Sequence, residues 1–145
     1  MLSTGQKGAI AELAIAARAV ELGVGVYRPV AEGGRYDLVF DVGGSLLRVQ
    51  CKWANLHDSV IVVCCRRCRR TKEGLLHRGY EVDEIDGIAA YCFELRRSFY
   101  LPIEQIAGRV ALQLGVHPTK NNQTHLVNWA ADFGLERLQS AGTGP

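Results

Sequence analysis

The amino-acid sequence predicts a single α/β domain with a mixed central β-sheet flanked by helices. Three features support this fold class: an opening run with helical periodicity, a pair of strand-like runs around a Gly-Gly turn, and later strands that alternate with short helical segments. The 145 residues suit one domain, and 48% of them are hydrophobic, enough to bury a core. We expect this domain to span residues 1–138, with a small, polar and flexible tail over residues 139–145.

The first predicted element is an amphipathic helix from Ser3 to Leu22. Its apolar positions recur every three or four residues, and a hydroxyl at Ser3 or Thr4 can cap it by accepting a backbone N–H. Gly23 ends the helix at little cost, because glycine tolerates positive φ. A short strand then follows over Val24–Pro29, where the proline stops it.

Two strand-like runs then surround a tight turn. Tyr36–Val42 is rich in β-branched and aromatic residues, Gly43-Gly44 supplies the turn, and Leu46–Trp53 forms the second run. Such a pattern predicts an antiparallel β-hairpin. A further strand is expected over Ser59–Cys65.

The second half of the chain predicts shorter elements. The basic stretch Arg66–Arg78, which contains Gly74, is expected to form a loop. Ile85–Phe93 is apolar enough for a buried strand. The other expected elements are a strand over Ser98–Leu101 that pairs with this buried strand, a short helix opened by Pro102, and a short helix over Leu126–Phe133.

The overall composition separates few classes of function. A net charge of +2 does not by itself indicate nucleic acid, and no apolar stretch approaches the roughly 20 residues of a membrane span. The N-terminal residues lack the basic-then-apolar layout of a secretory signal. The five cysteines are an odd number, and Cys64 and Cys65 are adjacent, which disfavours a disulfide framework. We therefore expect a cytoplasmic protein without a membrane partner.

Four polar residues are candidates for one site. Gln50 and Lys52 lie near the end of the second hairpin strand, and residues at i and i+2 of a strand leave the same face. Asp37 begins the partner strand, so antiparallel pairing brings it to the same end of the hairpin. Glu12, near the middle of the first helix, reaches this site if the helix packs on the sheet.

Acids and a lysine that converge on one sheet face are costly to bury. A hard cation such as Mg²⁺ relieves this cost, because it takes oxygen ligands from one or two carboxylates and keeps several waters. Asp37 is the expected central ligand, and the carbonyl oxygen of Gln50 or Cys51 can add another. Lys52 would lie beside the metal, where its ammonium orients an attacking water or helps to deprotonate it.

The segments that carry these residues resemble a known family. Gly8–Glu12, Arg35–Val39 and Val49–Lys52 are similar to the motifs of the PD-(D/E)XK nuclease superfamily, and in particular to the branch with group I intron-encoded homing endonucleases. The resemblance covers roughly residues 7–133. Further segments similar to the same branch are Asp86 with the strand Gly87–Phe93, Tyr100–Glu104 and Asn121–Gln123.

This resemblance implies a restriction-endonuclease-like core and phosphodiester hydrolysis on double-stranded DNA with Mg²⁺ or Mn²⁺, in a phage or bacterial host cell. It assigns Glu12 as the helix acid, Asp37 as a metal ligand, Gln50 to the second-acid position and Lys52 as the superfamily lysine. Gln50 departs from the pattern because most members have an acid there, and Tyr36 replaces the proline of the family name. The neutral Gln50 removes one negative charge from the expected metal site. Either Glu12 supplies that charge or only one ion binds tightly.

Basic residues gather directly after the third predicted strand. The run Arg66–Lys72, together with Arg78, contains six cations, and neutralising phosphates is the main source of DNA affinity. A polar segment around Lys120 and Asn122 is a second candidate, since asparagine can read adenine edges but is equally common in turns. The expected DNA-binding residues are Arg66, Arg67, Arg69, Arg70, Lys72, Arg78, Lys120 and Asn122.

Two other interpretations of single residues are weaker. Cys65 and Cys68 make one Cys-x2-Cys pair, whereas a structural zinc ion needs four ligands, so most cysteines are expected to be small buried hydrophobes. Trp53 adjoins Lys52 and is the aromatic residue to consider as a base-stacking platform. The aromatic residues Tyr36, Tyr91, Phe93 and Trp129 are expected in the core.

The predicted chain has one active site, whereas cleaving both strands of a duplex needs two. We therefore expect a homodimer or homotetramer on DNA. Two alternatives stay open at this point: a Holliday junction resolvase, which shares the core but recognises branched DNA, and a non-catalytic DNA-binding protein with the same fold.

Overall fold

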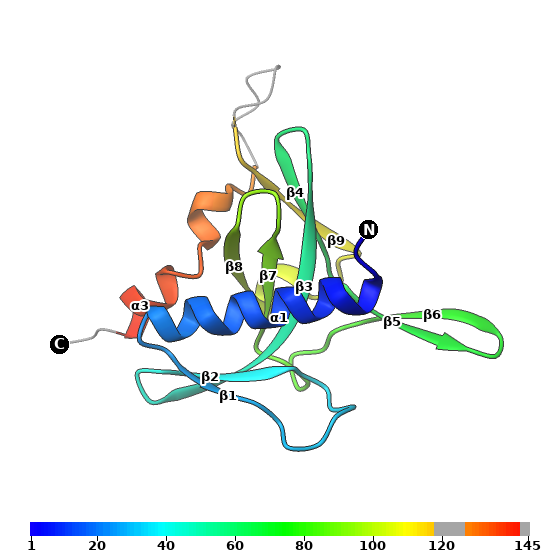
Figure 1. Cartoon of the computed structure of the whole chain (residues 1–145), viewed down its shortest axis with the longest axis horizontal. Coiled ribbons are helices and arrows are strands. Elements are labelled where there is room, and N and C mark those ends of the chain that lie inside the picture. Colours follow the sequence, from blue (N-terminus) through cyan, green and yellow to red (C-terminus); the bar gives the residue numbers. More distant parts are fainter. Residues whose placement is uncertain (118–126, 143–145) are drawn as a thin grey trace.

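The structure contains one mixed β-sheet with helices on both of its faces (Figure 1). This computed structural model describes residues 1–117 and 127–142. Strands β1, β2, β3, β4 and β9 follow one another across the sheet, and β7 and β8 branch from β3. The strands of this sheet are β1 Gly25–Tyr27, β2 Leu38–Val42, β3 Ser45–His57, β4 Val60–Cys64, β7 Gly87–Cys92, β8 Arg97–Pro102 and β9 Ala111–Gly115.

Strand β3 is the axis of the sheet because it changes partner along its length. It pairs antiparallel with β2 up to Val49, parallel with β7 over Val49–Ala54, and antiparallel with β4 over Asn55–His57. Val49 is paired on both edges, by Leu38 of β2 and by Gly87 of β7. Because β2 begins only at Leu38, which pairs with Val49, β2 does not cover β3 beyond this point. The edge of β3 that faces β2 is therefore open to side chains just after Val49.

Helix α1 (Thr4–Glu21) confirms the first predicted element. The Ser3 hydroxyl accepts the N–H of Gln6 at 3.2 Å, and the Gln6 side chain accepts the N–H of Ser3 at 2.8 Å, which together make a capping box. Gly23 follows the helix with a φ of 80°. The face of α1 that packs on the sheet is buried through Ala11, Ile15 and Ala19.

The β2–β3 hairpin is closed by Gly43 and Gly44, as the sequence predicts. Their φ values are 58° and 91°, and a type I′ turn requires positive φ at both central positions. Val42 pairs with Ser45 across the turn, so the register of the whole hairpin follows from this tight turn.

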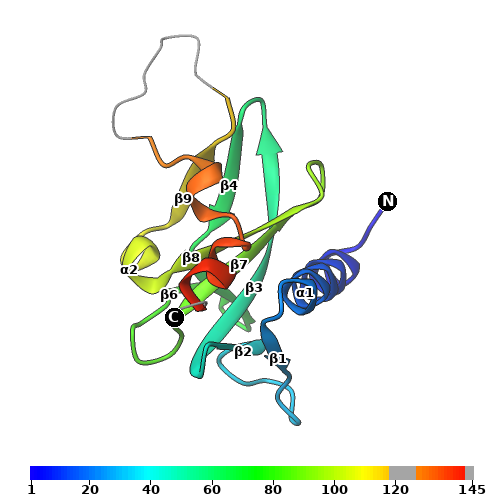
Figure 2. The same ribbon diagram turned by 90° about the vertical axis from the view of Figure 1, so that its left-hand side faces the viewer.

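Two hydrophobic clusters lie on opposite faces of the sheet. Under α1, one cluster includes Val49 of β3 and Ala89 of β7. On the other face, the second cluster includes Ala54 and is covered by α2 (Ile103–Ile106) and by the 3₁₀ helix η1 (Ala130–Phe133) (Figure 2). Because side chains alternate along a strand, Gln50 and Lys52 lie on the face away from α1.

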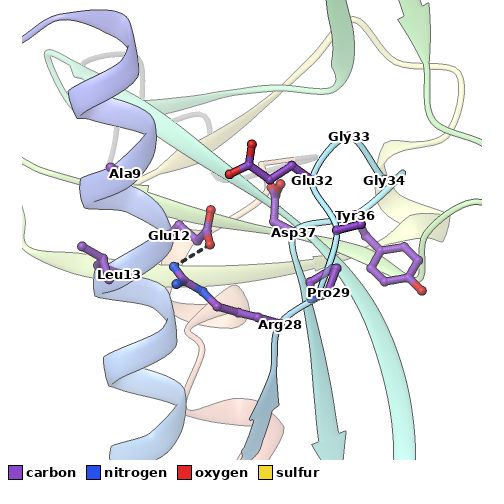
Figure 3. Close-up of a pocket in the computed structure, with 11 residues that line it drawn as sticks. Ala9, Glu12, Leu13, Arg28, Pro29, Glu32, Gly33, Gly34, Tyr36 and Asp37 are labelled. Carbon is purple, nitrogen blue, oxygen red and sulfur yellow. Dashed lines mark hydrogen bonds and ion pairs between the residues drawn. The ribbon is translucent and has the colours of Figure 1, made fainter.

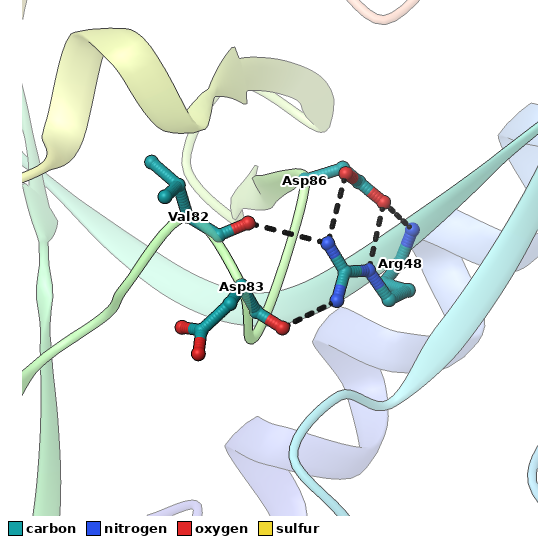
Figure 4. A network of polar contacts seen from close by, with 4 residues as sticks. All are labelled: Arg48, Val82, Asp83 and Asp86. Atoms are coloured by element: carbon teal, nitrogen blue, oxygen red, sulfur yellow. Dashed lines mark hydrogen bonds and ion pairs between the residues drawn. The ribbon is translucent and has the colours of Figure 1, made fainter.

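An ion pair joins β3 to the turn that precedes β7 (Figure 4). Arg48 donates from Nε to Asp86 Oδ2 at 3.0 Å and from Nη2 to Asp86 Oδ1 at 3.1 Å, and its backbone N–H donates to Oδ2 at 2.7 Å. The guanidinium also donates to the carbonyl oxygens of Asp83 and Val82. The side-chain hydrogen bonds from Arg48 hold the pKa of Asp86 below its usual range. Asp86 is therefore a structural anchor that fixes β7 beside β3.

The prediction of a loop over Arg66–Arg78 is wrong, because this stretch forms a β-hairpin. Strands β5 (Arg66–Thr71) and β6 (Gly74–Gly79) pair antiparallel as a separate two-stranded sheet, which we call the basic ribbon, residues 66–79. It projects away from the main sheet (Figure 1). The ribbon strands carry charged residues in place of an alternation of apolar and polar residues, so the signal for a half-buried strand was absent.

Most of the remaining predictions in the second half are confirmed. Strands β4, β7 and β8 lie within one or two residues of the predicted bounds, and Pro102 is the N-cap of α2. Strand β9 was not predicted, and helix α3 (Arg137–Gly142) includes the first residues of the segment predicted to be a flexible tail. In the segment predicted as a helix over Leu126–Phe133, Leu126 lies outside the described residues and η1 occupies the last four positions. Among the described helices, none has the length and apolar character needed to cross a membrane.

Candidate active site

Asp37 lies where β2 joins the edge of β3. Its N–H donates to the carbonyl oxygen of Val49 at 2.9 Å, which extends the strand ladder one residue beyond β2. Its Oδ2 accepts the N–H of Cys51 at 2.8 Å, so the carboxylate is held against the strand edge. The N–H and C=O of one strand residue point to the same edge, so the Cys51 carbonyl oxygen is directed toward the edge that Asp37 occupies.

A surface pocket opens between α1 and the loop that leads from β1 to β2 (Figure 3). The carboxylates of Glu12 on α1 and Asp37 before β2 both belong to it, although 25 positions separate them in sequence. Glu32 of the connecting loop adds a third acid. The lining residues are Ala9, Glu12, Leu13, Arg28, Pro29, Ala31, Glu32, Gly33, Gly34, Tyr36 and Asp37.

The electrostatic surroundings of Asp37 disfavour its charged form. Burial raises the pKa of Asp37 above its usual range, and the nearby charge of Glu12 raises it further. The hydrogen bond from Cys51 and the positive charges of Lys52 and Arg67 act in the opposite direction but do not reverse the shift. The folded chain therefore holds the ionised carboxylate of Asp37 at a cost that comes mainly from burial.

Glu12 has one direct partner in the pocket, the guanidinium of Arg28. Arg28 Nη2 donates to Glu12 Oε1 at 2.8 Å (Figure 3). The side chain of Arg28 is 59% exposed, whereas that of Glu12 is 29% exposed. The pair is thus a solvent-facing contact, and Arg28 can leave it without disturbing the core.

Lys52 approaches the site from the sheet face opposite α1. Its Nζ donates to the backbone carbonyl oxygen of Arg66 at 2.9 Å and lies 5.3 Å from the centroid of the Tyr80 ring. Its charge acts on Asp37, which places the ammonium in the same electrostatic environment as the carboxylate. Gln50 shares the face of Lys52 by strand alternation. The structure thus brings Glu12, Asp37 and Lys52 into one electrostatic environment, whereas Gln50 is placed only by its shared strand face with Lys52.

These groups can be tested against a metal ion by the chemistry of their donors. Among the side chains that the structure describes, no three of His, Cys, Asp or Glu lie close enough to hold a metal by themselves. The donors at the site are instead two carboxylates, Glu12 and Asp37, with the Gln50 amide and the Cys51 carbonyl oxygen. All are oxygen donors, which suit a hard divalent cation. The half-buried carboxylate of Asp37, with a second carboxylate at Glu12 in the same pocket, fits such an ion.

The basic residues of the ribbon divide into two groups. Arg67 donates to the carbonyl oxygen of Gly34 at 3.0 Å and lies 3.8 Å from Glu84, and Arg78 pairs with the same buried Glu84 at 3.0 Å. These two arginines are cross-strand partners at the base of the ribbon. Lys72, at the turn, is exposed. Of the other predicted DNA-binding residues, Lys120, Asn122 and the side chains of Arg69 and Arg70 lie outside the described residues.

Trp53 lies on the α1 face of the sheet, opposite to its neighbour Lys52. Its ring stacks on Phe93 with centroids 5.1 Å apart, and Lys7 lies 5.7 Å from its centroid. This packing gives Trp53 a role in the α1 cluster. The cysteines with described side chains are all free thiols; Cys65 and Cys92 are buried, and Cys64 is exposed.

Three residues around the site are not predicted from the sequence: Arg28, Tyr80 and Glu84. Arg28 follows a three-residue strand and carries no motif, so only the fold shows that it faces α1. Tyr80 and Glu84 follow the basic ribbon, and their partners are set by how the ribbon leaves the sheet. No signal in the sequence identifies these contacts.

The mixed sheet, together with Asp37 just before β2 and Gln50-x-Lys52 on β3, defines a nuclease with a restriction-endonuclease-like fold. The family model for the PD-(D/E)XK endonuclease matches residues 2–136, and the chain belongs to this family. Nucleases of this family generally use divalent metal ions, and the family implies a DNA substrate.

A solved structure supports the same conclusion over the whole chain. The structure of a bacterial homing endonuclease, I-Ssp6803I, is 26% identical in sequence and superposes with a TM-score of 0.72, covering 99% of this chain and 100% of that chain. No curated protein sequence matches this chain.

Proposed function

We propose that this protein is a Mg²⁺-dependent, site-specific endonuclease that hydrolyses phosphodiester bonds in double-stranded DNA, with Mn²⁺ as a substitute ion. The observation that carries the proposal is the convergence of Asp37, Glu12 and Lys52 at one edge of β3, with the pKa of Asp37 raised by burial and by Glu12. A likeness to a homing endonuclease over the full chain favours a duplex with a long specific site as the substrate.

Asp37 and Glu12 would hold the metal ion, together with the Gln50 side-chain oxygen and the Cys51 carbonyl oxygen. The raised pKa of Asp37 supports this assignment, because a bound divalent cation would offset the cost of burying the ionised carboxylate beside Glu12. Gln50 contributes an oxygen without a charge, so the site provides two carboxylates and suits one tightly held ion better than two. When bound, the ion supplies Lewis acidity and lowers the pKa of a coordinated water.

The catalytic work of the chain itself would fall mainly to Lys52. Its ammonium lies beside Asp37, where it can orient the attacking water by a hydrogen bond and offset the negative charge that develops on the phosphate. Asp37, fixed by the Cys51 N–H, keeps its carboxylate directed to the strand edge. Because Lys52 lies on β3 and Asp37 is tied to the same strand by hydrogen bonds to Val49 and Cys51, the distance between water and phosphate would be held closely.

The basic ribbon would bind DNA. A two-stranded β-ribbon fits the major groove of B-DNA, and arginines and lysines on it neutralise phosphates. Arg67 and Arg78 pair with Glu84 at the base, so they support the ribbon more than they touch DNA. The exposed Lys72 is then the described ribbon cation best placed for DNA phosphates. Arg66, Arg69, Arg70, Lys120 and Asn122 stay proposed contacts on the basis of the sequence alone.

One site per chain also supports a homodimer or homotetramer, since the two strands of a duplex are antiparallel and each needs a site. Sedimentation of the protein with duplex DNA in Ca²⁺ tests this point. A particle with one chain per duplex at saturating protein would contradict it.

The central experiment is cleavage of a supercoiled plasmid that carries the DNA flanking the gene in its genome. We expect linear product with Mg²⁺ or Mn²⁺, none with EDTA, and none with Asp37→Ala. Four-way junctions and single strands are assayed in parallel. Cleavage confined to junctions would instead indicate a resolvase, and binding without cleavage under every condition would indicate a DNA-binding protein.

A further inference from the structure

Tyr80 has a polar group that the fold leaves without a partner. The residue is 3% exposed, and its hydroxyl has no hydrogen bond within the described part of the chain. Buried polar atoms are almost always hydrogen-bonded, so an exception calls for an explanation. If the residue served packing alone, phenylalanine would fill the same space without this cost.

The groups around the hydroxyl are those of the candidate active site. Burial raises the pKa of Tyr80, whereas the Lys52 ammonium, close enough to act on the hydroxyl both as a donor and as a charge, lowers it. The charge of Arg67 lowers it further, and that of Asp37 raises it. The hydroxyl therefore stays protonated at neutral pH and faces the ammonium of Lys52. The ammonium lies 5.3 Å from the ring centroid, within the range of a cation–π contact.

Both contacts of the Lys52 ammonium come from the base of the ribbon. The carbonyl oxygen that accepts its proton belongs to Arg66, the first residue of β5, and Tyr80 directly follows Gly79, the last residue of β6. A lysine ammonium has three N–H donors, so the bond to Arg66 leaves two of them for other acceptors. The Tyr80 oxygen is a buried acceptor on the same side.

We propose that Tyr80 is a positioning residue for Lys52, whose ring and hydroxyl hold the ammonium beside Asp37. This inference rests on the proposed nuclease function. The base of the ribbon would then position Lys52, in addition to the proposed role of the ribbon in DNA binding. Without the hydroxyl, the ammonium loses a buried acceptor that is available to one of its remaining N–H groups. A displacement of about 1 Å at a reacting group can cost roughly a hundredfold in rate.

The experiment compares Tyr80→Phe with Tyr91→Phe, which removes a hydroxyl from another buried tyrosine on the α1 face. Cleavage of the plasmid with flanking DNA is followed in Mg²⁺, DNA affinity in Ca²⁺, and unfolding by heat. For Tyr80→Phe we expect kcat to fall by about 10- to 100-fold, with an unchanged affinity for DNA and an unchanged or higher Tm. Tyr91→Phe should leave kcat as in the unmodified protein.

A second measurement does not depend on cleavage. The chain has four lysines, so ¹³C-lysine labelling gives a simple spectrum, in which Lys52→Ala identifies the Lys52 signal. Its side-chain methylene protons should show a ring-current shift that Tyr80→Leu abolishes. Lys7, which lies over Trp53, provides an internal control whose shift should stay the same.

Different results overturn different claims. Wild-type cleavage with an equally active Tyr80→Phe variant would overturn the positioning role, as would a variant that loses DNA affinity and Tm together. A Lys52 signal that keeps its shift in Tyr80→Leu would overturn the positioning role independently of any cleavage assay. If the unmodified protein and Tyr91→Phe both fail to cleave any DNA, the proposed nuclease function fails instead.

Discussion

Two partly buried carboxylates lie beside β3, and their surroundings shift their pKa values in opposite directions. At Arg48, an arginine binds Asp86 through two side-chain hydrogen bonds and holds the pKa of that carboxyl below its usual range. Three residues further along β3, the N–H of Cys51 binds Asp37, and here burial and a second acid raise the pKa of the carboxyl. The first acid is matched by its partner, and the second is not.

This difference separates a structural acid from a candidate functional one. An acid whose charge is satisfied stabilises the folded chain, whereas an acid whose charge is unmatched costs stability and persists where a ligand repays it. Here the ligand is the proposed metal ion. Substituting Asp37 and Asp86 one at a time tests whether the two acids differ in this way.

The largest expected effect comes from Asp37→Asn. Cleavage should fall about a thousandfold or more, because a metal ligand supplies several kcal/mol of transition-state stabilisation. Unfolding in urea at neutral pH should not show a loss of stability, since the folded-state pKa of Asp37 is raised and its ionised form is unfavourable there. A variant that unfolds more easily and still cleaves would contradict both halves of this prediction.

Addition of metal should separate the two acids next. At a concentration one hundred times its dissociation constant, Mg²⁺ should raise the free energy of unfolding by about 2.7 kcal/mol. We expect this gain in the unmodified protein and in Asp86→Asn, its reversal by EDTA, and its absence in Asp37→Asn. Equal stabilisation of all three proteins would show that the ion binds somewhere other than Asp37.

Asp86→Asn should have a smaller effect, on stability alone. We expect a loss of about 1–2 kcal/mol in the free energy of unfolding at neutral pH, toward the lower value because the pair is partly solvated. Since the folded-state pKa of Asp86 lies below its usual value, its stabilisation is complete above that usual value and disappears as the pH falls through the folded-state pKa. Urea titrations across the acidic range should therefore show the two proteins converging at low pH.

Arg28→Gln should have the smallest effect. The exposed pair with Glu12 contributes less than about 0.5 kcal/mol to stability, but its removal frees Glu12 and takes a positive charge away from the pocket. Calorimetry with Ca²⁺ should then show roughly threefold tighter binding. Arg18→Gln, which breaks the exposed pair with Glu21 on the same helix, is the matched control and should leave Ca²⁺ affinity unchanged.

Much of the fold could be predicted because local signals and tertiary structure agree. Ser3, Gly23 and the Gly43-Gly44 turn each act within a few residues, and together they fix α1 and the register of β3. That register determines the common face of Gln50 and Lys52. The family motifs then identified Asp37 and Glu12, whose proximity depends on the packing of α1.

The rest of the site depends on contacts that no local pattern encodes. The basic ribbon was missed because its strands do not alternate apolar and polar residues. Arg28 and Tyr80 were missed because their partners, Glu12 and Lys52, lie far away in sequence. The Arg48–Asp86 pair could not be read from the sequence either, since 38 positions separate the two residues.

The way the ribbon joins the sheet has a consequence for how such a protein can diversify. A one-residue insertion in β3 would turn Lys52 to the wrong face, so this strand tolerates no change in length. The ribbon leaves at Arg66 and returns at Gly79 as a separate sheet, so paired residues can be added or deleted at its tip while its base stays in register. Evolution can therefore lengthen or exchange the ribbon tip as a module, and engineers can graft new tips, without disturbing the chemistry of the core.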